Sequence, residues 1–194
     1  MKSCTTPKAV PQPRVVVPGV NAEAKVAWEA PGSDGGCPLL SYHLWLKEIN
    51  QAEWAEVDAS QINNNTYVRS HTIDMQSFTF GDFYQVKISV DNAVGSAESD
   101  SAVFLLANLP GQPPKAERVS DGRTLQVVMS PPEEDGSSQT TGYSLETRAL
   151  GEEKWIVRTT ENNLKLTYLI DKSELKPASF IQVRYRCRNP IGFS

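Results

Sequence analysis

The sequence has few of the features that would identify an enzyme, a nucleic-acid binder or a membrane protein. Its 194 residues include only two histidines, His43 and His71, and neither lies in a motif that would activate a nucleophile. The net charge of −4 lacks the positive field with which nucleic-acid binders displace counterions from phosphates. No apolar run approaches the ~20 residues that span a bilayer. These absences predict a chain that is not an enzyme, binds no nucleic acid and inserts no segment into a membrane.

Cysteine is also scarce. The three cysteines, Cys4, Cys37 and Cys187, form no repeating framework, so the sequence predicts reduced thiols and favours an intracellular setting. The N-terminus has no apolar core like that of a signal peptide. The opposing signal is the tripeptide Asn64-Asn65-Thr66, an N-glycosylation sequon. A glycan at Asn64 would place the chain in the secretory pathway.

Candidate chemical sites are weak. Cys37 with His43 could form a nucleophile and base only if the thiol lay within hydrogen-bond reach of the imidazole, and a loop cysteine beside a solvent-facing histidine is the expected alternative. The acidic run Glu133–Asp135 lacks the alternating carboxylates of a calcium loop. Gly32-x-x-Gly35-Gly36 does not lead into a helix, as a phosphate loop would. We therefore expect no catalytic, cofactor or metal site.

A long internal repeat organises the chain. Met129 lies 101 residues after Trp28, and Tyr143 lies 101 residues after Tyr42. Later the offset falls to 97, which separates Asn189 from Asn92. Two units of ~100 residues are therefore expected, each large enough for a small β-sandwich.

Apolar and polar residues alternate with the period of two that is typical of half-buried strands. In the clearest run, Tyr84, Val86, Ile88 and Val90 are expected to face inward. Turn residues separate seven such segments in the first unit, which predicts an all-β fold. The segments are residues 14–17, 24–28, 42–48, 54–57, 67–75, 84–92 and 102–106.

The order and spacing of several short motifs resemble the fibronectin type III family, twice over. In the first unit these are Trp28-x-x-Pro31, Asp34-Gly35-Gly36-x-Pro38, Tyr42, Trp54, Tyr84 and Asn92-x-x-Gly95-Ser96. In the second they are Met129-x-x-Pro132, Asp135-Gly136, Tyr143, Trp155, Leu175-x-Pro177 and Asn189-x-x-Gly192. The resemblance implies two immunoglobulin-like β-sandwiches in tandem. It predicts a flexible tail (1–10), a first domain (11–108), a Pro-rich linker (109–114) and a second domain (115–194).

The resemblance also assigns structural roles to large side chains. It implies that Trp28 and Tyr42 pack in the first core and that Tyr84 forms the tyrosine corner of the family. The expected core residues of the second domain are Met129, Tyr143 and Trp155.

The second domain departs from the family pattern. Met129 replaces the core tryptophan, and Ile181 stands where the corner tyrosine is expected, so we expect this domain to be the less stable one. Its final strand is expected to be missing, which predicts that the chain is a fragment of a longer protein. The alternative is that a partner donates a strand to the open edge at residues 181–188.

Two groups of outward residues are candidates for partner binding. His43, Trp45 and Lys87 are expected together on one face of the first domain, since exposed tryptophan is common at interaction hot spots. Arg184, Arg186 and Arg188 alternate along a strand of the second domain, as a cationic stripe for an acidic partner or phosphate would. The alternatives are cross-strand packing of Trp45 beneath the Lys87 stem and an ordinary arginine–glutamate ladder.

The sequence therefore predicts a non-catalytic protein-interaction or scaffold segment of a larger multi-domain protein. Tandem modules with Asp-Gly-Gly corners resemble those of giant muscle and cytoskeletal proteins, which implies a cytoplasmic, cytoskeletal setting. The alternatives are part of a cell-surface receptor or adhesion ectodomain, and an accessory module of an enzyme whose catalytic domain lies elsewhere. The sequence does not name the protein partner.

Overall fold

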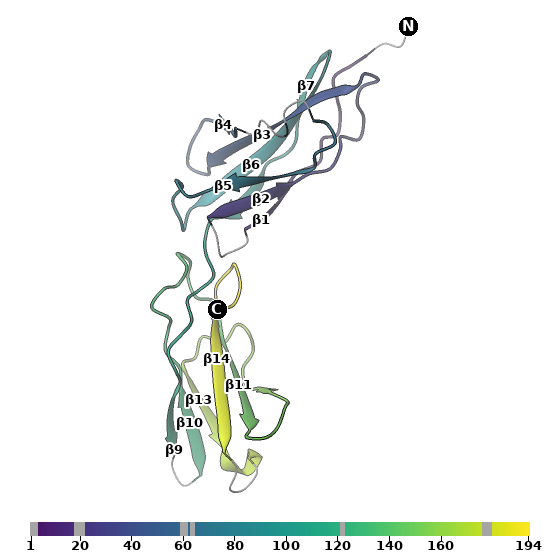
Figure 1. Ribbon diagram of the computed structural model, residues 1–194. Helices are drawn as coiled ribbons and strands as arrows, with labels where there is room; N and C mark the ends of the chain where they lie inside the picture. Colours follow the sequence, from purple (N-terminus) through teal and green to yellow (C-terminus); the bar gives the residue numbers. More distant parts are fainter. Residues whose placement is uncertain (1–3, 18–21, 59–61, 63–64, 121–122, 176–179) are drawn as a thin grey trace. The chain divides into compact units, whose positions relative to one another are not determined.

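The chain folds into two β-rich units. The computed structural model describes residues 4–17, 22–58, 62, 65–120, 123–175 and 180–194. These residues divide into unit 1, Met1–Leu106, and unit 2, Ala107–Ser194, each of which is described separately below (Figure 1). The only helix among the described residues is a single turn, η1 (Lys172–Glu174).

Unit 1 consists of two antiparallel sheets. One sheet has the order β1 (Arg14–Val16), β2 (Glu23–Ala27) and β5 (Ser70–Asp74). The other has the order β4 (Ala55–Glu56), β3 (Leu39–Glu48), β6 (Phe83–Asn92) and β7 (Gly95–Glu98), and β8 (Ala102–Leu105) also pairs with β6. Strand β7 was not expected, because Gly95 was interpreted as part of a turn alone.

Unit 2 repeats this plan. One sheet contains β9 (Glu117–Ser120), β10 (Thr124–Val128) and β13 (Thr167–Asp171), with β10 in the centre. The other contains β12 (Ile156–Val157), β11 (Gly142–Ala149) and β14 (Ile181–Arg188), with β11 in the centre. Strand β14 lies at the edge of its sheet in the part of the chain that is described.

The core of unit 1 follows the alternation in the sequence. Tyr84, Val86, Ile88 and Val90 on β6 are all at most 3% exposed. Tyr42 is fully buried, and its ring lies 5.9 Å from that of Trp28. The side chains between these inward positions point to the opposite side of the sheet, so β3 and β6 together present an outer face, on which Ser89 is covered.

Tyr84 makes the corner that the family resemblance implies. Its hydroxyl donates to the Thr79 carbonyl at 3.2 Å and accepts the Thr79 N–H at 3.0 Å. The ring packs edge-on against Phe78. The two hydrogen bonds fix the loop between β5 and β6 onto the core.

The core of unit 2 is smaller. Its buried apolar residues are Val127, Met129, Tyr143, Leu145, Ile170 and Cys187. Ile181 cannot make a corner hydrogen bond, but the Tyr185 hydroxyl accepts the Ser130 N–H at 3.1 Å and lies 2.5 Å from the Pro114 carbonyl oxygen. Trp155, which was expected in this core, instead lies partly exposed on the outer face of the sheet, because the chain immediately before the edge strand β12 turns its indole away from the interior.

Residues 4–10, termed here the leading segment, are not a free tail. Cys4 forms a disulfide with Cys37, with the two Cα atoms 5.6 Å apart. Lys8 and Ser33 form an isolated β-bridge. The expectations of a flexible tail and of reduced thiols are therefore wrong here; only Cys187 is free, and it is buried.

An asparagine holds the leading segment on the glycine-rich corner of unit 1. Asn92 donates through Nδ2 to the carbonyls of Thr5, at 2.7 Å, and Asp34, at 2.8 Å. Thr5 in turn donates its N–H to the Gly35 carbonyl. A Cβ at Gly35, where φ is 74°, would come within 2.0 Å of the Thr5 oxygen, so only glycine permits this approach.

Unit 2 repeats this arrangement, which we term the corner clamp. Asn189 donates to the carbonyls of Asn108, at 2.8 Å, and Asp135, at 3.0 Å. Asn108 donates its N–H to the Gly136 carbonyl. These bonds explain why unit 2 begins at Ala107 rather than at the expected residue 115. Ala107 and Ser138 stand where unit 1 has its two bonded cysteines, so this clamp has no covalent component.

Candidate functional site

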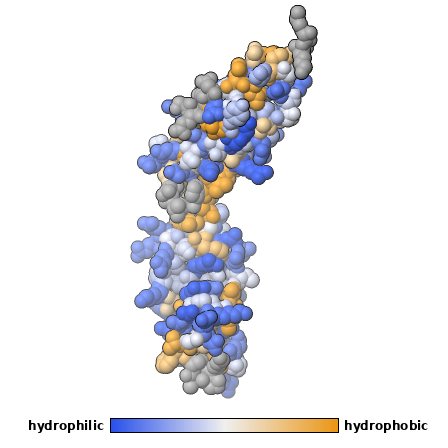
Figure 2. Space-filling view, turned by 45° about the vertical axis from the view of Figure 1, so that its right-hand side comes forward, coloured by the Kyte–Doolittle hydropathy of each residue, from blue (hydrophilic) through white to orange (hydrophobic). Residues whose placement is uncertain are grey.

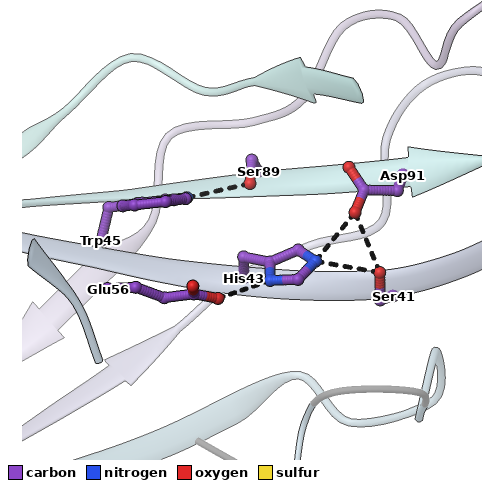
Figure 3. A network of polar contacts seen from close by, with 6 residues as sticks. All are labelled: Ser41, His43, Trp45, Glu56, Ser89 and Asp91. Carbon is purple, nitrogen blue, oxygen red and sulfur yellow. Dashed lines mark hydrogen bonds and ion pairs between the residues drawn. The ribbon is translucent and has the colours of Figure 1, made fainter. Parts of the chain in front are cut away.

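A compact polar network lies on the outer face of unit 1 (Figure 3). His43 on β3 lies between two carboxylates: its Nδ1 is 2.6 Å from Glu56 Oε1 on β4, and its Nε2 is 2.8 Å from Asp91 Oδ2 on β6. The Ser41 hydroxyl, two residues earlier on β3, donates to the same Asp91 oxygen at 3.0 Å. Strand pairing places these side chains together, since His43 and Asp91 point outward from adjacent strands.

The carboxylates favour the imidazolium form of His43. Partial burial alone would lower the pKa of His43, but hydrogen bonds to Glu56 and Asp91, together with their charges, outweigh burial and raise it above 6.5. Burial alone would raise the pKa of Asp91, but hydrogen bonds from Ser96, Ser41 and His43 lower it. The network is therefore an ion cluster in which the carboxylates stabilise the imidazolium charge of His43, and His43 stabilises the carboxylate charge of Asp91.

The sequence Ser41, His43, Glu56 resembles a nucleophile, base and orienting acid, but the geometry opposes catalysis. A general base needs a free lone pair on the nitrogen that faces the hydroxyl. Here both nitrogens of His43 face carboxylates. Nε2 also lies 3.0 Å from the Ser41 hydroxyl oxygen, but the serine donates its proton to Asp91. Cys37 is held in the disulfide, so the considered Cys37–His43 pair does not exist. Within the described residues, no cluster of histidine, cysteine or carboxylate side chains could hold a metal ion.

The other two predicted contact residues of unit 1 are also engaged within the domain. Trp45 is partly exposed and donates its indole N–H to the Ser89 hydroxyl at 3.0 Å. The Lys87 ammonium forms an ion pair with Glu98 at 2.7 Å and lies 4.8 Å from the centre of the Trp54 ring. The Lys47 ammonium lies 5.2 Å from the same ring. Trp45 and Lys87 are also direct partners across β3 and β6, as the alternative expectation required, and the ammonium at the end of Lys87 lies over Trp54.

The outer face of unit 2 carries the predicted arginines, and its visible side is mostly hydrophilic (Figure 2). Trp155 corresponds to Trp54, and its ring centre lies 4.1 Å from the guanidinium carbon of Arg184 and 4.5 Å from that of Arg148. Arg184 also donates to Glu146 at 2.6 Å. The two units therefore share a tryptophan flanked by two cations.

Arg186 differs from its two neighbours on β14. Its guanidinium lies 4.0 Å from the centre of the Phe193 ring. Arg188 lies 5.4 Å from that ring and is paired with Glu161 at 3.0 Å. No carboxylate pairs with Arg186 among the residues that the structure describes, and its side chain is exposed. The arginine–glutamate ladder that was the alternative expectation thus has one rung across the strands, Arg184–Glu146, while Arg188 pairs with a glutamate in a turn.

Sequence reasoning missed several members of these faces. Ser41, Glu56 and Asp91 escaped notice because they belong to three separate strands. The alternation that predicts an outward His43 also predicts outward side chains at Ser41 and Asp91, so the sequence contained a signal for these two. Glu56 could be placed beside them only from the pairing of β3 with β4. Phe193 was missed because it follows β14 and returns to pair with Arg188 as an isolated bridge.

Comparison with solved structures agrees with this architecture. The crystal structure of the chicken CNTN1 FN1–FN3 domains superposes with a TM-score of 0.58, covering 99% of this chain and 65% of that one at 18% identity. No protein-family model matches the chain. With its repeated sandwiches and corner motifs, the chain has the fold of tandem fibronectin type III domains.

Curated relatives include proteins of muscle. Human cardiac-type myosin-binding protein C is 28% identical over 196 residues, which is 99% of this chain and 15% of the relative. Chicken M-protein of striated muscle is 29% identical over 138 residues, 68% of this chain and 9% of the relative. Human myomesin-2 is 25% identical over 175 residues, 86% of this chain and 11% of the relative. The chain thus spans less than a sixth of these three relatives. Among the described residues, no helix is long and apolar enough to cross a membrane.

Proposed function

We propose that this chain is a non-catalytic interaction and scaffold segment of a larger multi-domain protein, and that it binds an acidic protein partner through the outer face of unit 2. The observation that carries the proposal is Arg186. Its guanidinium is exposed and stacked on Phe193, and no carboxylate of the described residues neutralises it. Arginine in this state offers planar donors that match a carboxylate.

The flanking residues support a contact surface. Arg184 and Arg188 flank Arg186 along β14, each paired with a glutamate, and Trp155 adds a partly exposed aromatic ring beside Arg184. Tryptophan and arginine are the residue types enriched at interaction hot spots. The relatives include proteins named for myosin binding, which supports a protein partner as a class.

The test is capture of partners from the source cells by the intact chain and by charge-reversal variants. Arg186→Glu should lose the partner, whereas Lys25→Glu, the same reversal at an exposed position of β2 in unit 1, should retain it. Trp45→Ala should also retain the partner, because Trp45 lies on unit 1. Equal capture by Arg186→Glu and the unaltered chain would refute the proposed surface.

Two cellular locations are candidates for this segment. The muscle relatives support a cytoplasmic, cytoskeletal protein. The Cys4–Cys37 disulfide supports the extracellular alternative, a receptor or adhesion ectodomain, because disulfides persist mainly in oxidising compartments.

Mass spectrometry of protein from its natural source separates the two candidates. A Cys4–Cys37 cross-link with a glycan at Asn64, which lies outside the described residues, would establish the extracellular setting. Free thiols at both cysteines and an unmodified Asn64 would support the cytoplasmic one.

A further inference from the structure

Unit 1 has a groove between its two sheets. It has a volume of about 720 Å³ and runs along β5, opposite the end of β3 and the strand β4. Ile73, Tyr84 and Leu46 form an apolar floor, and each is at most 4% exposed. A groove of this size falls within the range of protein ligand sites.

Both walls of the groove are strand edges. Strand β5 lies at the end of the order β1-β2-β5, and β4 lies at the end of its own sheet. Residues 69 and 75, which flank β5, hydrogen-bond toward the β2 side. Since these bonds alternate along an antiparallel strand, Thr72 directs its backbone N–H and C=O away from β2, toward the open edge. The groove therefore contains unused backbone donors and acceptors in an extended arrangement.

The rim of the groove is acidic. Glu48, Asp58 and Asp74 line it. Lys47 also lines it, but its ammonium donates to the Gln51 carbonyl at 3.0 Å and lies over Trp54. Burial lowers the pKa of His71 below 6.5, so this residue adds no positive charge at neutral pH.

Unit 2 shows the same groove in a closed form. The equivalent hollow measures about 290 Å³. Arg158 spans it, donating through Nε to the Thr147 hydroxyl at 2.9 Å and through Nη1 to Glu174 at 2.8 Å. Unit 1 has Val57 and Ser77 where unit 2 has Arg158 and Glu174, so no side-chain bridge forms there.

We propose that the open groove of unit 1 binds an extended basic segment of a partner protein by strand addition to β5. The backbone of the segment would bond to Thr72, and lysine or arginine side chains at alternate positions would reach Asp58 and Asp74. Alternate residues of a strand point to the same side, so a segment with basic residues at every second position fits one acidic rim. Strand addition provides the binding free energy through backbone bonds, and the rim provides the selection by charge.

This proposal is independent of the acidic partner assigned to unit 2, because the two surfaces lie on different units and select opposite charges. An Arg186→Glu variant is therefore expected to bind a basic peptide as the unaltered chain does. Loss of basic-peptide binding in that variant would contradict the assignment of the site to unit 1.

The experiment is an NMR titration of the intact, isotope-labelled chain with a peptide that alternates lysine and valine. Amide shifts are expected at residues 71–74 and 56–58, with none in β13 of unit 2. A matched peptide that alternates glutamate and valine is expected to bind at least ten-fold more weakly. Equal binding of the two peptides, or shifts confined to residues outside the groove, would overturn the proposal.

Variants separate the backbone contribution from the charge contribution. Thr72→Pro removes only an outward N–H and should weaken binding at least ten-fold, since proline is tolerated on an open edge. Leu169→Pro, at the matched edge position of β13 in unit 2, should leave it unchanged. Unaltered binding by the folded Thr72→Pro chain would refute strand addition.

Charge is tested by Asp58→Asn with Asp74→Asn. The Gln76 N–H donates to a side-chain oxygen of Asp74. Asparagine keeps an oxygen that accepts this bond, so the local turn is preserved. Peptide affinity should fall at least ten-fold in the double variant; unchanged affinity would show that the rim does not select the ligand. Grafting the bridge of unit 2 with Val57→Arg and Ser77→Glu should abolish binding.

Discussion

The outer faces of the two units have the same framework and opposite character. In each, a tryptophan lies between two cations, at Trp54 in unit 1 and Trp155 in unit 2. Beyond this shared element, unit 1 has the His43 network, in which every charge has a partner. At the matched positions of unit 2, Ser144 replaces His43 and Arg188 replaces Asp91. A few outward substitutions thus convert an internally satisfied surface into a cationic one, while the inward residues that specify the sandwich are retained.

The largest expected difference between the units is in stability. Unit 2 lacks the core indole and the tyrosine corner and buries fewer apolar residues. We expect its free energy of unfolding to be lower by about 3 kcal/mol, from the lost apolar burial and hydrogen bonds. Hydrogen exchange of the intact chain in increasing denaturant, read separately for β6 and β14, measures both values. Exchange of β6 before β14 would contradict this order.

The second largest difference between the units is expected at the corner clamp. Asn189 is fully buried and makes two side-chain donor bonds, to Asn108 and Asp135. Asn189→Ala should destabilise unit 2 by about 2–3 kcal/mol, because it removes the hydrogen bonds of a buried side chain to both carbonyls. Asn92→Ala should release the leading segment of unit 1 only after reduction of the Cys4–Cys37 disulfide. Proteolysis of the leading segment with and without reductant checks this, and cleavage of the oxidised variant at the reduced rate would refute it.

Two tyrosine hydroxyls offer a finer comparison. Tyr84 fixes a loop of unit 1 at Thr79, and Tyr185 fixes Ser130 in unit 2. Tyr84→Phe and Tyr185→Phe should each cost about 1–2 kcal/mol, in their own unit only, since each removes hydrogen bonds without altering the ring. Denaturant unfolding followed by exchange in each unit is the measurement. A loss that spreads to both units would show that the two do not unfold independently.

The smallest expected effect is the pH dependence of unit 1. The raised pKa of His43 stabilises the fold fully below pH 6.5, and this contribution is lost as pH rises through the folded pKa. The lowered pKa of Asp91 stabilises the fold above pH 3.8, and that contribution is lost as pH falls through the folded value. The network should therefore contribute most between these limits.

The melting temperature of unit 1 should fall by roughly 2–4 °C as pH rises from 6 to 9, as expected for a loss of about 0.5 kcal/mol in a domain of this size. His43→Gln should remove that change, and unit 2 provides the internal control because Ser144 does not titrate. NMR titration of the His43 ring gives its pKa directly. A value below 6.5 would disprove the assignment.

Local alternation and the 101-residue repeat predicted the fold well, because strand faces depend on nearest neighbours along the chain. Tyr84, Val86, Ile88 and Val90 are buried as the pattern indicated. The repeat carried this framework to Met129 and Tyr143 in the second unit. Such patterns are sufficient for the core because burial there is set by residue type.

The sites depend on contacts that alternation does not encode. The Cys4–Cys37 bond joins residues 33 positions apart and has no counterpart in unit 2, so the repeat gave no signal for it. Trp155 precedes a strand of only two residues, too short for alternation to assign its face. The groove depends on how β5 lies opposite β4 in the folded chain, which alternation along single strands does not encode.

The disulfide of the leading segment also has a mechanical consequence. Tension applied to the N-terminal end reaches Cys4 and can pass through the sulfur atoms directly to Cys37. The segment between these cysteines, which includes β1 and β2, then carries none of the tension. In unit 2 the corresponding load falls on the hydrogen bonds of Asn108, which are not covalent. The two domains should therefore yield to force by different routes, with the first extending from Cys37 onward.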